Sequence, residues 1–235
     1  MKKRFILQWT MKRAGSHAIV EWIKGHIKPG PFCFFNQRQI NCLVGPKRNH
    51  LISEDHEIFM FNLEDGKIVE NKVVDQRIKD LGLSNQIEKR INIILLRDPF
   101  NIFASRMRGW SLKFAENSVK LWKEYAKEFL RETQKLDNVL PLNFNSWFSN
   151  EDYRKQLSID LDLEFSDSGK NNLGYWGSSF DGKEYKSNAN EMNVINRWRN
   201  YVDDENYINL FDEEIISLSK RIFNFCPEEI IKQIK

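Results

Sequence analysis

The chain has 235 residues, 41% of them hydrophobic, which suits one domain with a sizeable core. Its formal net charge of +3 fits an anionic ligand but gives little support for a nucleic-acid partner, and we expect none. Three cysteines without C-x-x-C spacing argue against a disulfide framework and a metal site. Without an apolar run of about 18 residues or a targeting segment, we expect no membrane span and a cytoplasmic protein.

The first predicted elements are a strand over about residues 4–9 and a helix over about 16–27. The turn between them is basic and contains Gly15. A strand–loop–helix of this kind directs backbone N–H groups and the positive end of a helix at an anion. Residues 31–50 are predicted to be irregular because proline, glycine and asparagine recur in them, and residues 58–61 predict another strand.

A nearly continuous apolar run over residues 90–96 is typical of a strand that is buried on both faces in a parallel sheet. Asp98 and Pro99 then predict the cap and the first turn of a helix. Apolar residues at helical spacing predict a long amphipathic helix over 114–136, and a short strand is predicted over 139–143.

The C-terminal part begins with a long stretch rich in Ser, Gly and Asn, residues 166–190, which we interpret as a lid or a binding loop. The alternation of strands and helices indicates an α/β fold with a central parallel β-sheet flanked by helices. We expect a single domain over residues 1–235, with the closing loop and the C-terminal helices at about 166–235. The terminal helices are predicted around residues 191–201, 212–219 and 227–234.

The first loop departs from the phosphate-binding loop of nucleotide kinases, G-x-x-x-x-G-K-[ST]. Gly15 matches the second glycine, whereas Thr10 stands in place of the first. Ser16 stands in place of the lysine, and His17 in place of the magnesium-binding hydroxyl. The loop therefore keeps the geometry and loses the magnesium–triphosphate chemistry, which suits a smaller anion such as a sulfonate. The alternative is an ordinary α/β turn with basic residues at the surface.

A second anion site is predicted at Arg97, at the carboxyl end of the buried strand, where open α/β sheets bind ligands. Ser105 follows eight residues later, about two turns into the helix at about 1.5 Å per residue, so a folded arginine side chain can meet its hydroxyl around one phosphate. The alternative is an arginine paired with Asp98 beside a solvated helix. Together, the two sites predict a nucleotide-like ligand with two separated anionic groups.

These two loops resemble the cofactor-binding elements of the PAPS-dependent sulfotransferases, where PAPS is 3′-phosphoadenosine-5′-phosphosulfate. The family's first element, Lys or Arg–Ser–Gly–Thr–Thr, binds the 5′-phosphosulfate, and Arg13-Ala14-Gly15-Ser16-His17 is similar to it. The second element, R-D-P with a serine eight residues after the arginine, binds the 3′-phosphate, and Arg97-Asp98-Pro99 with Ser105 matches it. Residues 174–182 and 197–201 are similar to the family's closing segment, although its R-K-G triplet is absent.

The resemblance implies a P-loop NTPase-like sulfotransferase fold and transfer of a sulfonate from PAPS to a hydroxyl or amine, with release of PAP (adenosine 3′,5′-bisphosphate). Arg13 takes the position of the catalytic cation. A general base is also needed; His56 is the candidate, with Glu54 and Asp55 as alternatives at the same place. No metal is implied. The implied cofactor-binding residues are Lys12, Arg13, Ala14, Gly15, Ser16, His17, Arg97, Ser105, Gly177, Ser178, Ser179 and Arg197.

Two other functions stay open, namely a P-loop-like nucleotide kinase or NTP-binding protein, and a non-catalytic module that binds an anionic ligand. The acceptor is a glycan or another small molecule that the sequence does not identify, and residues 31–50 and 166–190 are expected to shape its pocket. Trp22 and Trp122 are expected in the core, whereas Trp9 is a candidate to stack on adenine or on the acceptor.

Overall fold

The protein is built on a parallel β-sheet. A computed structural model describes residues 3–27, 32–37, 57–80, 82–107, 112–171 and 192–234. Within them, five strands pair in the order β2-β3-β1-β4-β5, and every neighbouring pair is parallel, so the predicted central parallel sheet is confirmed. The strands are β1 (Lys3–Thr10), β2 (Phe32–Gln37), β3 (Ile58–Glu64), β4 (Ile87–Leu96) and β5 (Val139–Asn143).

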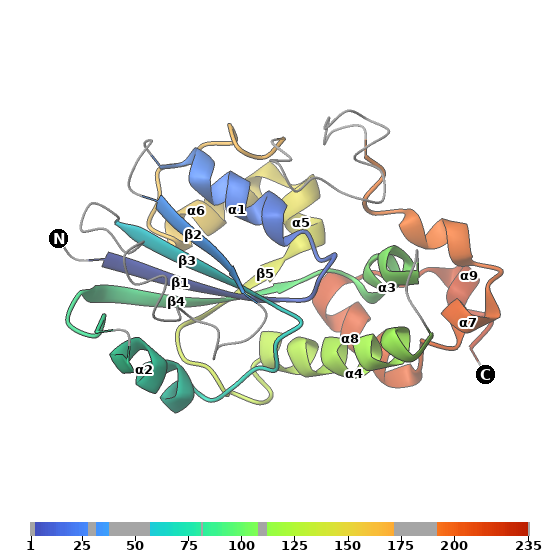
Figure 1. Cartoon of the computed structure of the whole chain (residues 1–235). Helices are drawn as coiled ribbons and strands as arrows, with labels where there is room; N and C mark the ends of the chain where they lie inside the picture. The colour runs from blue at the N-terminus through green and yellow to red at the C-terminus, as the bar shows by residue number, and fades with distance from the viewer. Residues whose placement is uncertain are drawn as a thin grey trace.

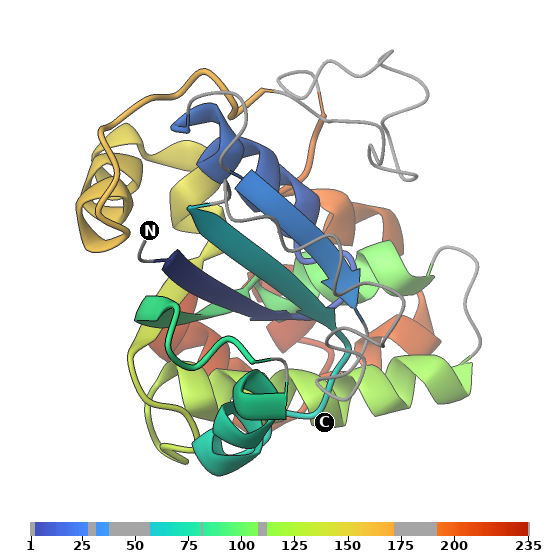
Figure 2. The same cartoon turned by 60° about the vertical axis from the view of Figure 1, so that its left-hand side comes forward.

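Helices cover both faces of this sheet. They are α1 (Ser16–Gly25), α2 (Asn71–Asp80), α3 (Pro99–Met107), α4 (Leu112–Phe129), α5 (Phe144–Ser149), α6 (Glu151–Asp160), the 3₁₀ helix η4 (Arg197–Tyr201), α7 (Glu205–Ile208), α8 (Glu213–Phe223) and α9 (Glu228–Ile231). Helices α1, α5 and α6 lie on one side of the sheet, and α2 and α4 lie on the other (Figures 1 and 2). Helices α3, α7, α8 and α9 lie beyond the carboxyl ends of the strands (Figure 1). Across the described ranges, no helix has the length and apolar character that a membrane crossing requires.

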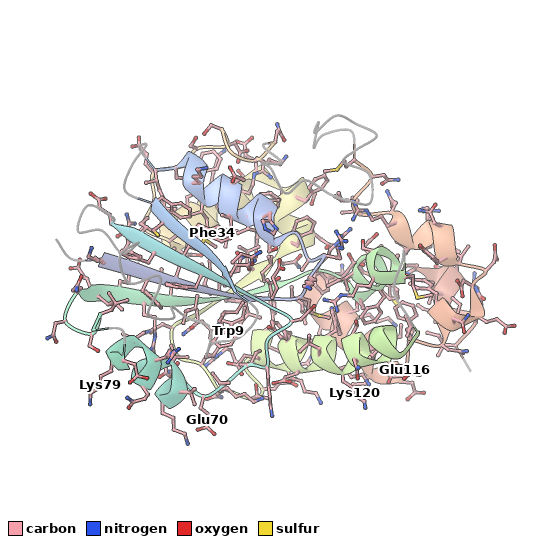
Figure 3. The ribbon with its side chains drawn as sticks, viewed as in Figure 1. Trp9, Phe34, Glu70, Lys79, Glu116 and Lys120 are labelled. Atoms are coloured by element: carbon pink, nitrogen blue, oxygen red, sulfur yellow. The ribbon has the colours of Figure 1, made fainter. Side chains whose placement is uncertain are left out.

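The central strands are apolar on both faces because helices cover both. Trp22 and Trp122 are fully buried, as predicted. Trp9 is 1% exposed and donates from its indole nitrogen to Oδ1 of Asn92 on β4 (3.1 Å), so it is a core residue and the expectation that it stacks on a ligand is wrong. Figure 3 shows Trp9 and Phe34 on opposite faces of the sheet, in agreement with the strand register.

Two predicted ranges need correction. Residues 31–50 were expected to be irregular, but β2 occupies residues 32–37 as an edge strand. The helix expected over 114–136 ends at Phe129. The helix ends here because the fully buried carboxylate of Glu128 accepts hydrogen bonds from the residues that follow, which turn back over it. The donors are the Arg131 guanidinium (2.6 Å), the Thr133 hydroxyl and the backbone N–H groups of Lys135 (3.0 Å) and Leu136 (3.2 Å).

Candidate active site

The loop between β1 and α1 contains two residues in the left-handed region. Gly15 has φ +95° at the N-cap of α1, and a Cβ there would lie 2.1 Å from Cε2 of Phe144, so only glycine fits. Arg13 has φ +72°, which is uncommon for a residue with a side chain. The loop is therefore bent tightly enough to bring the start of α1 against β5 and α5, and its shape places a strained arginine at the turn.

The first turn of α1 points its backbone N–H groups out of the helix. The first N–H groups bonded within the helix are those of Ala18 and Ile19, which donate to the Gly15 carbonyl at 3.0 and 3.2 Å. Ser16 and His17 precede them, at the positions whose N–H groups have no acceptor within a helix. With the positive end of the helix dipole, this turn is suited to hold an anionic group, as the sequence predicts.

A buried ion pair fixes the loop from the side of β3 and α3. Arg106, which is 1% exposed, donates to the Lys12 carbonyl from Nε (3.1 Å) and Nη2 (2.9 Å) and pairs with Asp65. Asp65 also accepts a hydrogen bond from the Lys12 N–H (3.0 Å). The ion pair therefore binds both the carbonyl and the N–H group of Lys12. Burial lowers the pKa of the Arg106 guanidinium, and the Asp65 carboxylate opposes that shift. Neither Asp65 nor Arg106 was among the predicted site residues.

Arg97 joins the two predicted anion sites. It lies just after β4, is 2% exposed, and donates from Nη1 to the Arg13 carbonyl (3.0 Å) and from Nη2 to the Val194 carbonyl. Its guanidinium carbon lies 5.3 Å from the centroid of the Phe144 ring. Carbonyl acceptors are neutral, so these bonds orient the guanidinium without cancelling its charge.

The start of α3 matches the predicted cap. Oδ1 of Asp98 accepts from the Asn101 N–H (2.8 Å), and Pro99 is the first helical residue. The Asn145 amide also donates to Asp98 (2.9 Å). Burial raises the pKa of Asp98, while the charge of Arg97 and the hydrogen bonds from Asn101 and Asn145 act in the opposite direction.

The C-terminal segment lies against α3 and brings a further cation to Ser105. Nη1 of Arg197 donates to the Ser105 hydroxyl (3.0 Å), and the Arg197 N–H donates to Oδ1 of Asn101 (2.8 Å). Nδ2 of Asn101 donates to the Ile195 carbonyl (2.8 Å), which fixes the same segment a second time. The structure thus brings together Ser105 and Arg197, two predicted cofactor-binding residues that are far apart in the sequence. Asn101, which joins them, was not among the predicted site residues.

On the other side of the loop, Ser16 faces β3. Its hydroxyl donates to Oε1 of Glu64 at 2.6 Å, and Glu64 is the last residue of β3. Nδ1 of His17 lies 3.5 Å from the same hydroxyl, and the His17 ring packs edge-on against Phe34 of β2. Glu64 was not among the predicted site residues either.

Three of the four predicted catalytic residues and part of the closing loop lie outside the described residues, so their roles stay predictions. In the described ranges, no group of three or more His, Cys, Asp or Glu side chains is arranged to hold a metal ion. Two of the three cysteines, Cys33 and Cys226, are described, and both are free thiols. The site residues outside the described ranges are Glu54, Asp55, His56, Gly177, Ser178 and Ser179.

Comparison with known proteins identifies the fold. No protein-family profile and no curated protein matches the sequence. A solved structure of the sulfotransferase domain from the Synechococcus PCC 7002 olefin synthase matches with a TM-score of 0.58 and 12% identity, over 97% of this chain and 98% of that domain. The mouse sulfotransferase SULT7A1, solved in complex with PAP, matches with a TM-score of 0.51 and 13% identity, over 99% of this chain and 90% of that one. The chain therefore has the α/β fold of the sulfotransferase domains, as its sequence predicted.

Proposed function

We propose that this protein is a PAPS-dependent sulfotransferase, which transfers a sulfonate from PAPS to a hydroxyl or amine and releases PAP. The fold supports this proposal, and a mouse protein of similar fold was solved with PAP. The observation that carries it is the 3.0 Å bond from Arg97 to the Arg13 carbonyl, because it joins one residue of each predicted anion site. One nucleotide with two separated anionic groups can then occupy both.

Most of the predicted residues have a role in this proposal. Arg97, Ser105 and Arg197 hold the 3′-phosphate. This role is supported by the bond from Arg197 to Ser105 and by the bond from Arg97 to Val194, which belongs to the same C-terminal segment as Arg197. The backbone N–H groups of Gly15, Ser16 and His17 hold the 5′-phosphate at the start of α1. The N–H of Ala14, which was also predicted to do so, donates instead to the Met11 carbonyl (3.1 Å). Lys12 adds positive charge beside the same turn. Gly177, Ser178 and Ser179 belong to the segment that closes over the nucleotide.

In the transfer step, the acceptor attacks sulfur in line with the bond to the bridging oxygen. Arg13 stabilises the negative charge that develops on the bridging and leaving oxygens. Its partly exposed side chain extends from a turn that Arg97 and the Lys12 contacts hold in place, so little reorganisation is needed during the reaction. The acceptor, a carbohydrate or another small molecule, is not identified by these residues. We propose that the chain acts as one cytoplasmic domain.

Ligand-dependent thermal unfolding tests the proposal. PAP, ATP with Mg²⁺, and heparin are compared at equal concentration. PAP at about 100 times its Kd stabilises the folded state by about 2.7 kcal/mol, so we expect it to raise Tm clearly, and the other two to have little effect. Stabilisation by ATP only with Mg²⁺ indicates a nucleotide kinase or NTP-binding protein instead, and salt-sensitive stabilisation by heparin alone indicates a binding module. Labelled PAPS with a panel of hydroxylated and amine acceptors then measures transfer.

A further inference from the structure

The end of β3 places one carboxylate beside the loop that binds the sulfonate in the proposed function. Glu64 pairs in register with Thr10, the last residue of β1, so the two strands end together. The hydroxyl of Ser16, the first residue of α1, donates to Oε1 of Glu64 at 2.6 Å. Glu64 is therefore hydrogen-bonded to the first residue of the helix whose start is proposed to hold the 5′-phosphosulfate.

The sheet order separates this carboxylate from the residues proposed to hold the 3′-phosphate. β1 lies between β3 and β4, and the loop follows β1. Arg97 and Ser105 follow β4, and Arg197 joins them there. Glu64 is on the opposite side of the loop, with β3. An acceptor that attacks sulfur opposite to the leaving nucleotide must approach from the side away from β4, which is the side of Glu64.

The Glu64 carboxylate has one oxygen available for chemistry. Oε1 is engaged by Ser16, and among the described residues no hydrogen bond reaches Oε2, while the side chain is partly exposed. Asp65, the next carboxylate, differs because its Oδ1 binds both Arg106 and the Lys12 N–H. Asp98 is fully buried and caps α3. Of these three carboxylates, Glu64 is the one that faces the predicted acceptor side and is not committed to structure.

We propose that Glu64 is the general base of the transfer, an inference that rests on the proposed function. The acceptor oxygen forms a bond to sulfur, the bond from sulfur to the bridging oxygen breaks, and the electron pair of that bond leaves with PAP. The proton of the acceptor hydroxyl passes to Oε2 of Glu64 and from there to water. The Ser16 hydroxyl holds the carboxylate in place through Oε1. This assignment competes with that of His56, Glu54 or Asp55.

The Glu64→Gln substitution tests this role because it keeps the shape and an acceptor for Ser16 while removing the basic carboxylate. Glu57→Gln is the matched control, since Glu57 is exposed and immediately precedes β3, at the opposite end of the same strand. Three quantities are measured for each variant: PAP affinity by titration, PAP release from PAPS with water as the acceptor, and transfer to the panel acceptor with the highest rate.

We expect Glu64→Gln to lower kcat by about 10²- to 10⁴-fold with PAP affinity within twofold of the parent protein, and Glu57→Gln to change neither. The acidic limb of the pH profile of kcat/KM should disappear in Glu64→Gln, an effect that a merely structural role would not produce. Formate should restore part of the activity of Glu64→Gly. The charged and titratable groups near Glu64, which set the rest of the profile, are Lys12, Arg13, His17, Asp65, Arg106 and Tyr125.

The outcomes separate this inference from the proposed function. If the parent protein does not bind PAP, both the proposed function and the role of Glu64 are wrong. If PAP binds but Glu64→Gln keeps kcat within threefold, or keeps the acidic limb, Glu64 is not the base and the proposed function stands. A parent protein that binds PAP but turns over no PAPS, with water or with any acceptor, also overturns the inference.

Discussion

The two ends of α1 show opposite ways of using polar side chains. At its C-terminal end, polar groups pair with one another: Arg154 donates three bonds of 2.7–3.1 Å to Asp167, and the Trp22 indole donates to the same carboxylate (3.3 Å). His26 bonds through Nδ1 to the Trp22 carbonyl (2.7 Å) and through Nε2 to the Ser158 hydroxyl (3.1 Å). Burial lowers the pKa of His26, which favours its neutral form. Both ring nitrogens of this histidine are therefore used in holding the structure together.

At the N-terminal end, the backbone N–H groups of the first turn point out of the same helix. The nearby Arg97 guanidinium is oriented by two backbone carbonyls. Arg97 donates to the carbonyls of Arg13 and Val194, whereas Arg154 pairs with the Asp167 carboxylate. The contrast shows that burial of an arginine does not by itself mark a binding site. Arg106 at the N-terminal end and Arg154 at the C-terminal end each pair with a carboxylate, whereas the recorded bonds of Arg97 go to carbonyls, and Arg97 is the arginine proposed to bind the nucleotide.

The largest expected effects come from two buried arginines that pair with carboxylates, one at each end of α1. Arg106→Leu and Arg154→Leu each break a buried ion pair, so each should lower the free energy of unfolding by about 3–5 kcal/mol. Only Arg106→Leu should also lower PAP affinity, because only Arg106 holds the Lys12 carbonyl. Urea unfolding and PAP titration at low temperature measure the two effects. Equal loss of PAP affinity in both variants would contradict the proposed division between the ends of α1.

Gly15→Ala should lower the free energy of unfolding by about 2–4 kcal/mol, because a side chain at φ +95° is strained and its Cβ would overlap the Phe144 ring. Urea unfolding measures the change. Adding Phe144→Leu should recover part of the loss in the double variant, since it removes the overlap but not the backbone strain. No recovery would show that the ring contact is not what requires glycine.

Arg97→Ala should weaken PAP binding by about 2 kcal/mol, roughly 30-fold, because a charge-assisted contact to phosphate is lost. Arg90→Ala is the control: Arg90 lies earlier on β4 and pairs with Asp75, away from the carboxyl end. Calorimetric titration with PAP measures both. A PAP affinity within twofold of the parent in Arg97→Ala would remove Arg97 from the 3′-phosphate site.

The smallest effect concerns pH at the scaffold end. Although burial acts to raise it, the pKa of Asp167 is lowered by the hydrogen bonds and charge of Arg154. A carboxyl whose pKa is lower in the folded state adds stability above its unfolded pKa of about 3.9, and this stability is lost as pH falls through the folded value. Asp167→Asn should therefore cost about 1 kcal/mol at pH 7 and less below pH 4, as urea unfolding at the two pH values would show. A cost independent of pH would mean that packing, not charge, sets it.

The sequence predicted those parts of the fold and site that local patterns encode. β1, the loop at Gly15, β4 and the capped start of α3 follow from apolar runs, glycine and the Asp98-Pro99 pair, and all are confirmed. Helices α5 and α6 were missed although their N-cap residues, Asn143 and Asn150, accept bonds from the first turn in the usual way. Their short lengths left too little apolar periodicity to detect.

The missed site residues share a different cause. Glu64 and Asp65 reach the loop only because β3 pairs with β1, although more than 50 residues separate Glu64 from Thr10 in the chain. Arg106 and Asn101 act through contacts with segments 94 residues away or more. Strand order and helix placement determine such contacts, and no local spacing in a single sequence encodes them.

The left-handed backbone of Arg13 has a consequence for how this protein can be stabilised. Glycine at that position would remove a steric cost of about 1–2 kcal/mol from the folded state. It would also raise the conformational entropy of the unfolded chain, which costs somewhat less, so the free energy of unfolding should rise by roughly 0.5 kcal/mol. A screen for thermostable variants should therefore select Arg13→Gly repeatedly. In the proposed function, the same substitution removes the cation that stabilises the leaving group, so stability and turnover would make opposite demands on this residue.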